Sequence, residues 1–232
     1  MLRNVFSMLV VVLLFVVSLT GVGCKREEGG DGTSAGKRRI VIGMVAKSQS
    51  NDVFQAAYAG AKDAAKELGD KYNAEITIDW RTPVGEDAIK QVEAVEALTR
   101  ANVQAILVSC SEAGTLTPAI DRAVDKGVPV MTFDSDAPAS KRFAFYGTSD
   151  EECGKRIMAA LIKSMDGKGT VAILAGNQSA PNLQNRVKGA RDEIARNPGI
   201  TLLPAAGGVF YHEETPEKAA AVSYTHLRAH ET

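Results

Sequence analysis

An internal repeat is the feature that most limits how this chain can fold. Residues 46–63 align without a gap to residues 175–192, an offset of 129, and seven of the eighteen aligned pairs are identical. About one identity would be expected by chance from average composition. Each copy begins where an apolar run ends, passes through a polar loop and enters a helical pattern. The repeat therefore predicts two related α/β lobes, and a ligand between them could be held from both sides.

The segment before the first copy indicates export. Arg3 precedes an apolar run, Met8–Leu19, and small residues follow up to Gly23 and Cys24. Signal peptides have a positive start, a short apolar run and then small residues, so we expect a signal peptide at residues 1–23. The apolar run is too short to span a bilayer. The end of this segment resembles the lipobox of bacterial lipoproteins, whose cysteine is acylated, although Gly21 replaces the usual larger aliphatic residue. We expect lipidation of Cys24, with a plain signal peptide or a retained anchor as alternatives.

Residues 24–38 have the composition of a flexible tether. They are rich in glycine and in charges of both signs, and from Lys25 to Lys37 they contain no aliphatic side chain larger than alanine. Such a segment cannot bury a core, so we expect it to hold a globular body near a membrane. The whole chain has 232 residues, of which 45% are hydrophobic and 24% charged, with a net charge of −1. This composition fits a globular α/β protein and, without a basic excess, gives no reason to expect nucleic acid as a partner.

Two further cysteines, Cys110 and Cys153, could form a disulfide in an oxidising compartment. One follows a predicted strand of the first lobe and the other begins a predicted helix of the second, so a bridge would obstruct hinge motion. We therefore favour two unpaired thiols.

The first lobe alternates strand and helix patterns. Three almost continuously apolar runs predict inner strands that helices cover on both faces, at Ile40–Val45, Ala105–Val108 and Val128–Phe133. Glu75–Trp80 alternates polar and apolar residues instead, which predicts an edge strand. With this second strand at an edge and right-handed crossovers, the expected strand order is 2-1-3-4, and a fifth strand can follow to give 2-1-3-4-5.

Apolar residues spaced by three and four predict the intervening helices, over about 53–68, 89–98 and 116–124. Ser50, Asn51 or Asp52 can cap the first helix. We expect Gly69 and Gly127 to end the first and the third helix.

The expected strand order places a topological switch point between the first and third strands, where ligands bind in open α/β sheets. The loops concerned are 47–54, 109–115 and 134–136, and the repeat adds 176–183 as the facing loop of the second lobe. Some side chains there have a structural alternative to ligand contact. Asn51 is equally well explained as a helix cap. Core packing explains Phe54 somewhat better than ligand contact, whereas ligand contact explains Asp134 better than a turn or cap role. Trp80, which closes the edge strand, fits packing better than ligand contact.

The chemistry of these loops favours binding over catalysis. They hold amides, hydroxyls, carboxylates and one large aromatic residue, which suit a neutral polyol, and the first-lobe and facing loops contain no histidine. No G-x-G-x-x-G follows the first strand and no G-x-x-x-x-G-K-[ST] occurs, so we expect neither an enzyme nor a nucleotide cofactor. His226 and His230 could meet on one helical face, but we disfavour a metal site there.

Several short motifs follow one another in a specific order. They are Ile-Val-Ile-Gly-Met-Val with Ser-Asn-Asp-Val-Phe after it, Gly-Val-Pro-Val-Met-Thr-Phe-Asp-Ser-Asp-Ala-Pro, and Tyr-Gly-Thr-Ser-Asp. Together they resemble the ribose-type periplasmic sugar-binding proteins, from about Arg39 to Val222. The resemblance implies two Rossmann-like lobes that close on one monosaccharide and deliver it to an ABC importer in the membrane.

The resemblance also implies a set of ligand-binding residues. Ser135 stands where the ribose binder has an arginine, and Gln184 replaces another sugar-contacting arginine, with Arg186 two residues later as a candidate substitute. These departures leave open whether the sugar is ribose or a related one. The expected ligand-binding residues are Lys47, Asn51, Phe54, Asp134, Ser135, Gln184 and Arg186.

The expected domain boundaries follow from the repeat. The N-terminal lobe covers residues 39–143 and the second lobe residues 144–222, with the crossover at Phe143–Gly147, where Gly147 can absorb a hinge movement. The third strand of the first lobe starts near Gln104, so its counterpart should start near residue 233. We therefore expect the second lobe to be incomplete and poorly ordered. Residues 223–232 resemble a non-native tail of translated sequencing adapter.

Three functions are compatible with these patterns. An extracytoplasmic sugar receptor of an ABC importer, monomeric and located in the periplasm or cell envelope, accounts for the export signal, the tether, the repeat and the polar loops. A ligand-sensing subunit for a membrane signalling protein, or a binder of another small molecule, would share all these features. A repressor's effector domain would carry a helix-turn-helix in place of the signal sequence.

Overall fold

The computed structural model describes residues 37–227, which belong to one unit that begins at Lys37. The expected signal peptide, Cys24 and residues 24–36 of the expected tether lie outside the described residues, as do residues 228–232 of the expected tail. Within the described part, no helix is long and apolar enough to cross a bilayer.

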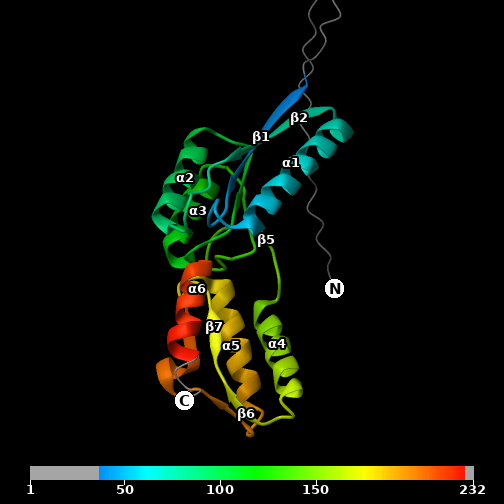
Figure 1. The fold of residues 1–232 in the computed structure, drawn as a ribbon. Coiled ribbons are helices and arrows are strands. Elements are labelled where there is room, and N and C mark those ends of the chain that lie inside the picture. The colour runs from blue at the N-terminus through cyan, green and yellow to red at the C-terminus, as the bar shows by residue number, and fades with distance from the viewer. Residues whose placement is uncertain (1–36, 228–232) are drawn as a thin grey trace, which may run out of the picture. The chain divides into compact units, whose positions relative to one another are not determined.

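A single parallel sheet organises the first lobe (Figure 1). Its strands lie in the order β2-β1-β3-β4-β5, which confirms the predicted order 2-1-3-4-5. β2 lies at an edge, as its alternating sequence predicts, and the nearly continuous apolar strands β1, β3 and β4 lie inside the sheet. The strands span Arg38–Val45 (β1), Ala74–Trp80 (β2), Ala105–Val108 (β3), Val130–Phe133 (β4) and Ala144–Tyr146 (β5).

Helices cover both faces of this sheet, as predicted. α1 (Asp52–Tyr72) lies on one face, and α2 (Ala88–Arg100) and α3 (Ala113–Asp125) lie on the other (Figure 1). The main apolar core forms between the sheet and the α2 and α3 pair, because the apolar residues of these helices recur at intervals of three and four. Its buried members include Val45, Leu98, Ile106, Leu116 and Ile120.

The first helix shows how local sequence sets its ends. Asn51 caps its start, because the side-chain oxygen accepts a hydrogen bond from a backbone N–H two residues later at 3.0 Å. The prediction that Gly69 ends the helix is wrong, since the helix continues to Tyr72 and ends at Asn73, whose φ is 49°. Gly69 is buried inside the helix, where a Cβ would lie 2.8 Å from a carbonyl oxygen at the start of β2. Glycine there allows α1 to approach the sheet closely.

In the described residues, the second lobe consists of short strands and helices. Strands of three residues form two parallel pairs, β6 with β8 and β7 with β9. The apolar run that ends at the second copy of the repeat is divided between β6 and β7. β8 is followed by a turn in which Ala206 and Gly207 take positive φ, and then by β9, which the sequence analysis did not predict. The bounds are Asp150–Ser164 (α4), Gly169–Val171 (β6), Ile173–Ala175 (β7), Pro181–Ala195 (α5), Ile200–Leu202 (β8), Ala205–Gly208 (η1), Val209–Tyr211 (β9), Pro216–Val222 (α6) and Ser223–Leu227 (η2).

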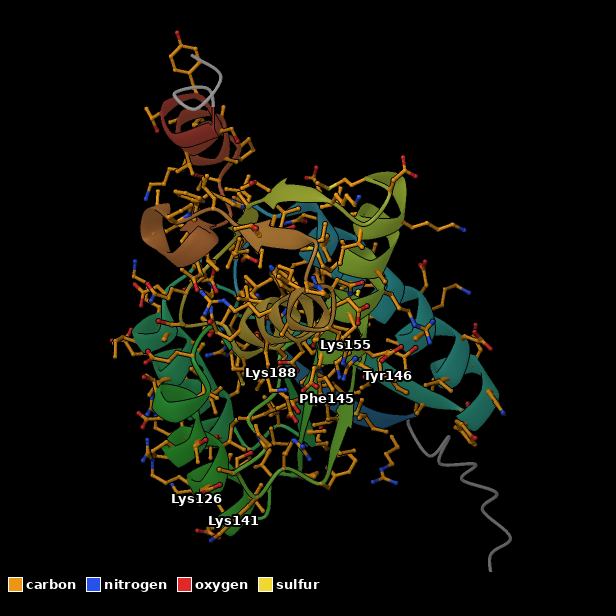
Figure 2. The ribbon with its side chains drawn as sticks, turned by 90° about the horizontal axis from the view of Figure 1, so that it is seen from below. Lys126, Lys141, Phe145, Tyr146, Lys155 and Lys188 are labelled. Atoms are coloured by element: carbon orange, nitrogen blue, oxygen red, sulfur yellow. The ribbon has the colours of Figure 1, made fainter. Side chains whose placement is uncertain are left out.

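α4 and α5 pack backbone against backbone. A Cβ on Gly154 would overlap the carbonyl of Arg186, and a Cβ on Gly189 would overlap the carbonyl of Glu151. The contact is also polar, because Glu151 lies 2.7 Å from Lys155 on its own helix and 3.0 Å from Lys188 of α5. Figure 2 shows these two lysines, one from each helix. The two glycines therefore fix how closely the helices approach.

Apolar packing in the second lobe is divided between two small clusters. One contains Met158, Ile162, Val171, Ala190 and Ile200, and the other contains Ala175, Val187 and Val209. The structure thus gives regular elements to a lobe that the sequence predicted to be poorly ordered. Its strands occur as pairs, whereas the first lobe has a sheet of five.

β5 leads from the first lobe into α4 of the second. The segment predicted as the crossover, Phe143–Gly147, contains this strand and pairs with β4. A Cβ on Gly147 would overlap only the outer ring atoms of Phe145, a side chain that can turn away, so packing alone does not require glycine at this position. Cys110 and Cys153 are both free thiols. Burial raises the pKa of the Cys110 thiol to about 12, which keeps it protonated at neutral pH.

Candidate ligand-binding cleft

Three loops meet at the carboxyl ends of β1, β3 and β4, where the strand order predicts a crevice. Gln91 of α2 holds two of them together, although the sequence analysis did not single it out. Its side-chain amide donates to the carbonyl oxygens of Ala46 at 2.8 Å and Ser109 at 2.7 Å, and its oxygen accepts from the N–H of Ser111 at 2.9 Å. Gln91 is fully buried, so these three backbone groups depend on it.

Asp134 follows β4 and points its carboxylate toward the neighbouring loops. The Ser109 hydroxyl donates to Oδ2 of Asp134 at 2.8 Å. The backbone of Asp134 has a φ of 57°, in the left-handed region that aspartate tolerates better than most residues, and its N–H donates to the carbonyl of Tyr146. An unusual backbone conformation is therefore maintained at a proposed ligand residue, as is common at functional sites.

Lys47 lies where the loops of the two lobes meet, with only 2% of its surface exposed. Its Nζ lies 3.5 Å from Oδ1 of Asn182, 3.6 Å from Oε1 of Glu214 and 4.0 Å from Oδ2 of Asp134. It also lies 6.0 Å from the centre of the Phe54 ring. An ammonium group has three N–H donors, and charge-assisted hydrogen bonds favour 2.7–2.9 Å, so these contacts leave its donor capacity underused.

The second lobe supplies the facing side of the cleft. Asn182 lies in the first turn of α5, and its amide nitrogen is 3.5 Å from Oδ1 of Asp134. Glu214 lies in the turn between β9 and α6. Burial raises the pKa of Glu86, in the loop that follows β2, to about 7, and the neighbouring Glu214 carboxyl adds to the shift. Polar groups from both lobes therefore meet around Lys47.

The structure brings together only part of the predicted ligand set. Lys47, Phe54 and Asp134 converge, and Phe54 is also 98% buried, so it has the packing role that was its alternative. Asn51 serves as a helix cap. Ser135 is fully buried beside Asp134, and its hydroxyl has no partner among the described residues.

Gln184 and Arg186 have partners within the second lobe. The Gln184 amide lies 3.4 Å from the Tyr211 hydroxyl, and Nε of Arg186 donates to Asp150 at 2.8 Å. Burial raises the pKa of Asp150, and Arg186 opposes that shift. Trp80 stacks on Tyr58 with ring centres 4.5 Å apart, which agrees with the packing role favoured for it.

Asn182, Glu86 and Glu214 are cleft residues that the sequence analysis did not name. Asn182 falls inside the facing loop, 176–183, that the repeat predicted. The other two occupy corresponding loops, since Glu86 follows the second strand of the first lobe and Glu214 follows β9, 128 positions later. The gapless part of the repeat, 46–63 with 175–192, covers only the loops that follow the first strands, so it does not reach these two residues.

The cleft is suited to holding hydroxyl groups. Carboxylates accept hydrogen bonds from a sugar's hydroxyls, the amide of Asn182 and the ammonium of Lys47 donate to its oxygens, and a buried aromatic ring lies nearby. Among residues 37–225, no group of three or more His, Cys, Asp or Glu side chains is arranged to hold a metal ion. The disfavoured pair His226 and His230 has no described side chains.

A hollow of about 530 Å³ lies along β7. Its lining is mainly apolar surface from α4, β7 and α5, including Ile157, Met158 and Leu174. Its charged and polar side chains are Asn51, Arg186, His212 and Glu214. Two residues of the expected ligand set, Asn51 of the first lobe and Arg186 of the second, therefore line the same hollow.

Comparison with known proteins agrees with this architecture. The family model described as the periplasmic binding protein domain matches residues 42–231. The chain belongs to the periplasmic binding protein family. Within the family, it is 31% identical to the ribose import binding protein RbsB of Bacillus subtilis over 157 residues, which cover 67% of this chain and 49% of that protein. It is 24% identical to the D-ribose/D-allose-binding protein of Pseudomonas aeruginosa, over 80% of this chain and 59% of that protein.

Solved structures of family members show the same fold. A solute-binding protein of an ABC transporter from Burkholderia graminis, in complex with D-arabinose, is 27% identical, with a TM-score of 0.74 over 85% of this chain and 64% of that one. The glucose-galactose binding protein GanP of Geobacillus stearothermophilus is 29% identical, with a TM-score of 0.73 over 84% of this chain and 66% of that one. The chain spans about half to two thirds of the length of these relatives. These relatives are named as binding proteins.

Proposed function

We propose that this chain is part of an extracytoplasmic substrate-binding protein that captures a neutral monosaccharide between two lobes and delivers it to an ABC transporter permease. One observation carries the proposal: Asp134, oriented by Ser109, meets Asn182 of the second lobe at 3.5 Å, beside the underused ammonium of Lys47. A hydroxyl group both donates and accepts hydrogen bonds, so it can pair with the carboxylate and the ammonium at once. Relatives named for ribose, allose and arabinose support a pentose or hexose as the ligand.

The proposed ligand set keeps the residues expected from the sequence and adds Asn182. Lys47, Asp134 and Asn182 provide the central polar contacts, and Phe54 provides an apolar edge. Ser135 contributes through its position beside Asp134, whereas Asn51, Gln184 and Arg186 must leave their present partners to reach a sugar. The protein needs no cofactor or metal for this role and acts as a monomer. It lies in the periplasm or cell envelope, attached through a lipid on Cys24.

A sensing role is the second candidate. A fructose-binding periplasmic domain of a hybrid two-component system shares the fold at a TM-score of 0.72 and 24% identity, and the protein titled XylFII in a complex with LytSN does so at 0.74 and 25% identity. Capture of a sugar between two lobes serves either role, because a permease and a sensor can both read the closed form. Co-purification with a permease or with a sensor kinase would separate the two.

An NMR titration with D-ribose, D-allose, D-arabinose and D-fructose tests the proposed function, and it also detects weak binding. We expect one of these sugars to shift the amides of loops 47–54 and 134–136 and of the first turn of α5. Asp134→Ala should weaken that binding by roughly 10- to 150-fold, equivalent to about 1.5–3 kcal/mol, because it leaves sugar hydroxyls without a charged acceptor. Asp125→Ala, at an exposed position far from the cleft, is the matched control. Unchanged affinity in Asp134→Ala would remove Asp134 from the site.

A further inference from the structure

The loop between β4 and β5 begins at Asp134 and is closed by its own side chains. Thr132 of β4 donates its hydroxyl to Oδ1 of Asp136 at 2.6 Å. These two residues flank Asp134 at equal distances in the sequence, so their hydrogen bond closes a turn around it. A backbone bond inside this turn runs from the N–H of Ser135 to the carbonyl of Phe133 at 2.6 Å.

The closed turn holds Asp134 in an uncommon backbone conformation. Its φ of 57° lies in the left-handed region, which residues other than glycine seldom occupy unless their surroundings keep them there. The direction of a side chain follows from the conformation of its backbone. A turn of another shape would therefore point the Asp134 carboxylate away from the Ser109 hydroxyl, which now donates to it at 2.8 Å.

Arg142 fixes the Asp136 carboxylate from the far end of the same loop. Its Nε donates to Oδ1 of Asp136 at 2.5 Å, and its Nη2 donates to Oδ2 at 2.6 Å. Two parallel hydrogen bonds set the plane of a carboxylate as well as its position. Only 20% of the Arg142 side chain and 19% of the Asp136 side chain are exposed, so water screens this ion pair less than one on the open surface.

The Asp136 carboxylate is also held by the backbone, because the N–H of Ala137 donates to its Oδ1 at 2.8 Å. Burial acts to raise the pKa of Asp136, but the hydrogen bonds that it accepts, above all those from Arg142, outweigh burial and lower the pKa. The carboxylate therefore stays ionised at neutral pH, as its two-point contact with the guanidinium requires.

We propose that Asp136 and Arg142 are positioning residues of the sugar site, because their ion pair closes the turn that directs the Asp134 carboxylate toward Ser109 and the second lobe. Neither residue needs to touch the ligand. The inference rests on the proposed function for the identity of the ligand, whereas the effect of the pair on Asp134 is measurable without any sugar.

NMR of the sugar-free protein tests the pair at Asp134. Arg142→Ala should change the three-bond coupling between the amide and α protons of Asp134, which reports φ, and the chemical shift of its carboxyl carbon. Arg142→Lys keeps the charge but not the two-point contact, so its effect should be smaller, and it makes the same test if Arg142→Ala does not fold.

Lys141→Ala is the matched control for this measurement. Lys141 lies in the same loop and pairs with Asp125 at 2.6 Å, but more than half of each side chain is exposed. The control should leave both signals of Asp134 unchanged. If Arg142→Ala also leaves them unchanged, whatever it does to the melting temperature, the positioning role is wrong.

A double-mutant cycle on sugar affinity tests whether the pair acts through Asp134. For the sugar that binds the parent protein, Arg142→Ala should weaken binding by about tenfold, the scale of one charge-assisted hydrogen bond. In the Asp134→Ala background the same substitution should have no further effect, because no carboxylate remains to be positioned. An equal loss in both backgrounds would overturn the proposal. If none of the sugars binds the parent protein, the proposed function fails, and the sugar-free NMR result still decides the role of the pair.

Discussion

Single residues at the ends of the first-lobe strands determine whether the cleft is formed. Gln91 connects the ends of β1 and β3 through three hydrogen bonds, although it is a polar side chain with no exposed surface. Sequence periodicity placed position 91 on a helix but could not show which strands would be near it. The same limit applies to Lys47, whose burial depends on residues 135 and 167 positions away in the chain.

Replacing Gln91 with leucine should destabilise the first lobe strongly. The substitution keeps the approximate volume but leaves two buried carbonyl oxygens and one buried N–H without partners, at about 1–3 kcal/mol for each group. We expect a loss of about 3 kcal/mol or more in the free energy of unfolding, measured by urea denaturation. Gln104→Leu, at a more exposed glutamine, is the control and should change stability by much less. A change below about 1 kcal/mol in Gln91→Leu would show that water replaces the lost bonds.

The sequence explains Asn51 equally well as a helix cap and as a ligand contact. The two roles predict different effects of substitution on stability and on sugar affinity. As a cap alone, Asn51→Ala should cost about 1 kcal/mol of stability, and Asn51→Ser should restore most of it, because serine is also a good cap. Sugar affinity would then be the same in Asn51→Ser and in the parent protein. If the amide also contacts the ligand, Asn51→Ser would keep the melting temperature but lose affinity. Melting curves together with the NMR titration separate the two roles.

At the scale of elements, corresponding helices of the repeat are in different surroundings. Gly60 of α1 and Gly189 of α5 are equivalent positions, 129 residues apart. A Cβ on Gly60 would meet nothing within 4 Å, whereas a Cβ on Gly189 would overlap the backbone of α4. The sequence shows both glycines as identical, so only the packing reveals that one is required for helix contact and the other is not.

This difference predicts opposite effects of the same substitution. Gly60→Ala should stabilise the protein by about 0.5–1 kcal/mol, because alanine favours an exposed helix position. Gly189→Ala should destabilise it by about 1–3 kcal/mol, because α4 and α5 must move apart. Thermal unfolding of the two variants, each serving as the control for the other, tests the prediction. Destabilisation of similar size in both would contradict the packing of α4 against α5.

Strand patterns predicted the first lobe well and the second lobe only in part. In the first lobe, each apolar run was continuous and each strand lies within about two residues of its prediction at either end. In the second lobe, the counterpart of β2 is interrupted by Pro204, which has no N–H to donate, and by Ala206 and Gly207 with positive φ. Such a turn is not visible as a break in hydrophobic periodicity, so β9 was missed.

At the scale of the whole molecule, the two lobes are packed unequally. Their backbone amides should therefore be protected to different degrees from hydrogen exchange with solvent. The first lobe has one large core beneath a sheet of five strands, and the second has two small clusters beneath pairs of three-residue strands. Amides of β1, β3 and β4 should therefore exchange slowly with solvent, and those of β6 to β9 much faster. Hydrogen exchange followed by mass spectrometry or NMR measures this difference. Similar protection in both lobes would show that the second lobe is as stable as the first.

The candidate site could be predicted only where it follows from topology. The strand order located the crevice, and Lys47 and Asp134 lie in the loops that it indicated. The partners of these residues could not be assigned, because they depend on how two lobes meet, which neither composition nor periodicity describes. The repeat came closest, since it identified 176–183 as the facing loop and so included Asn182.

The burial of Lys47 also bears on the order in which the molecule assembles. The first lobe is made from one continuous stretch of chain, Arg38 to Tyr146, so all five of its strands can pair before any part of the second lobe takes shape. Of the three polar partners of Lys47, two belong to the second lobe. A first lobe formed without the second would leave this ammonium hydrated, since drying a charge with only Asp134 nearby is costly. Docking of the second lobe is therefore the step that removes water from Lys47.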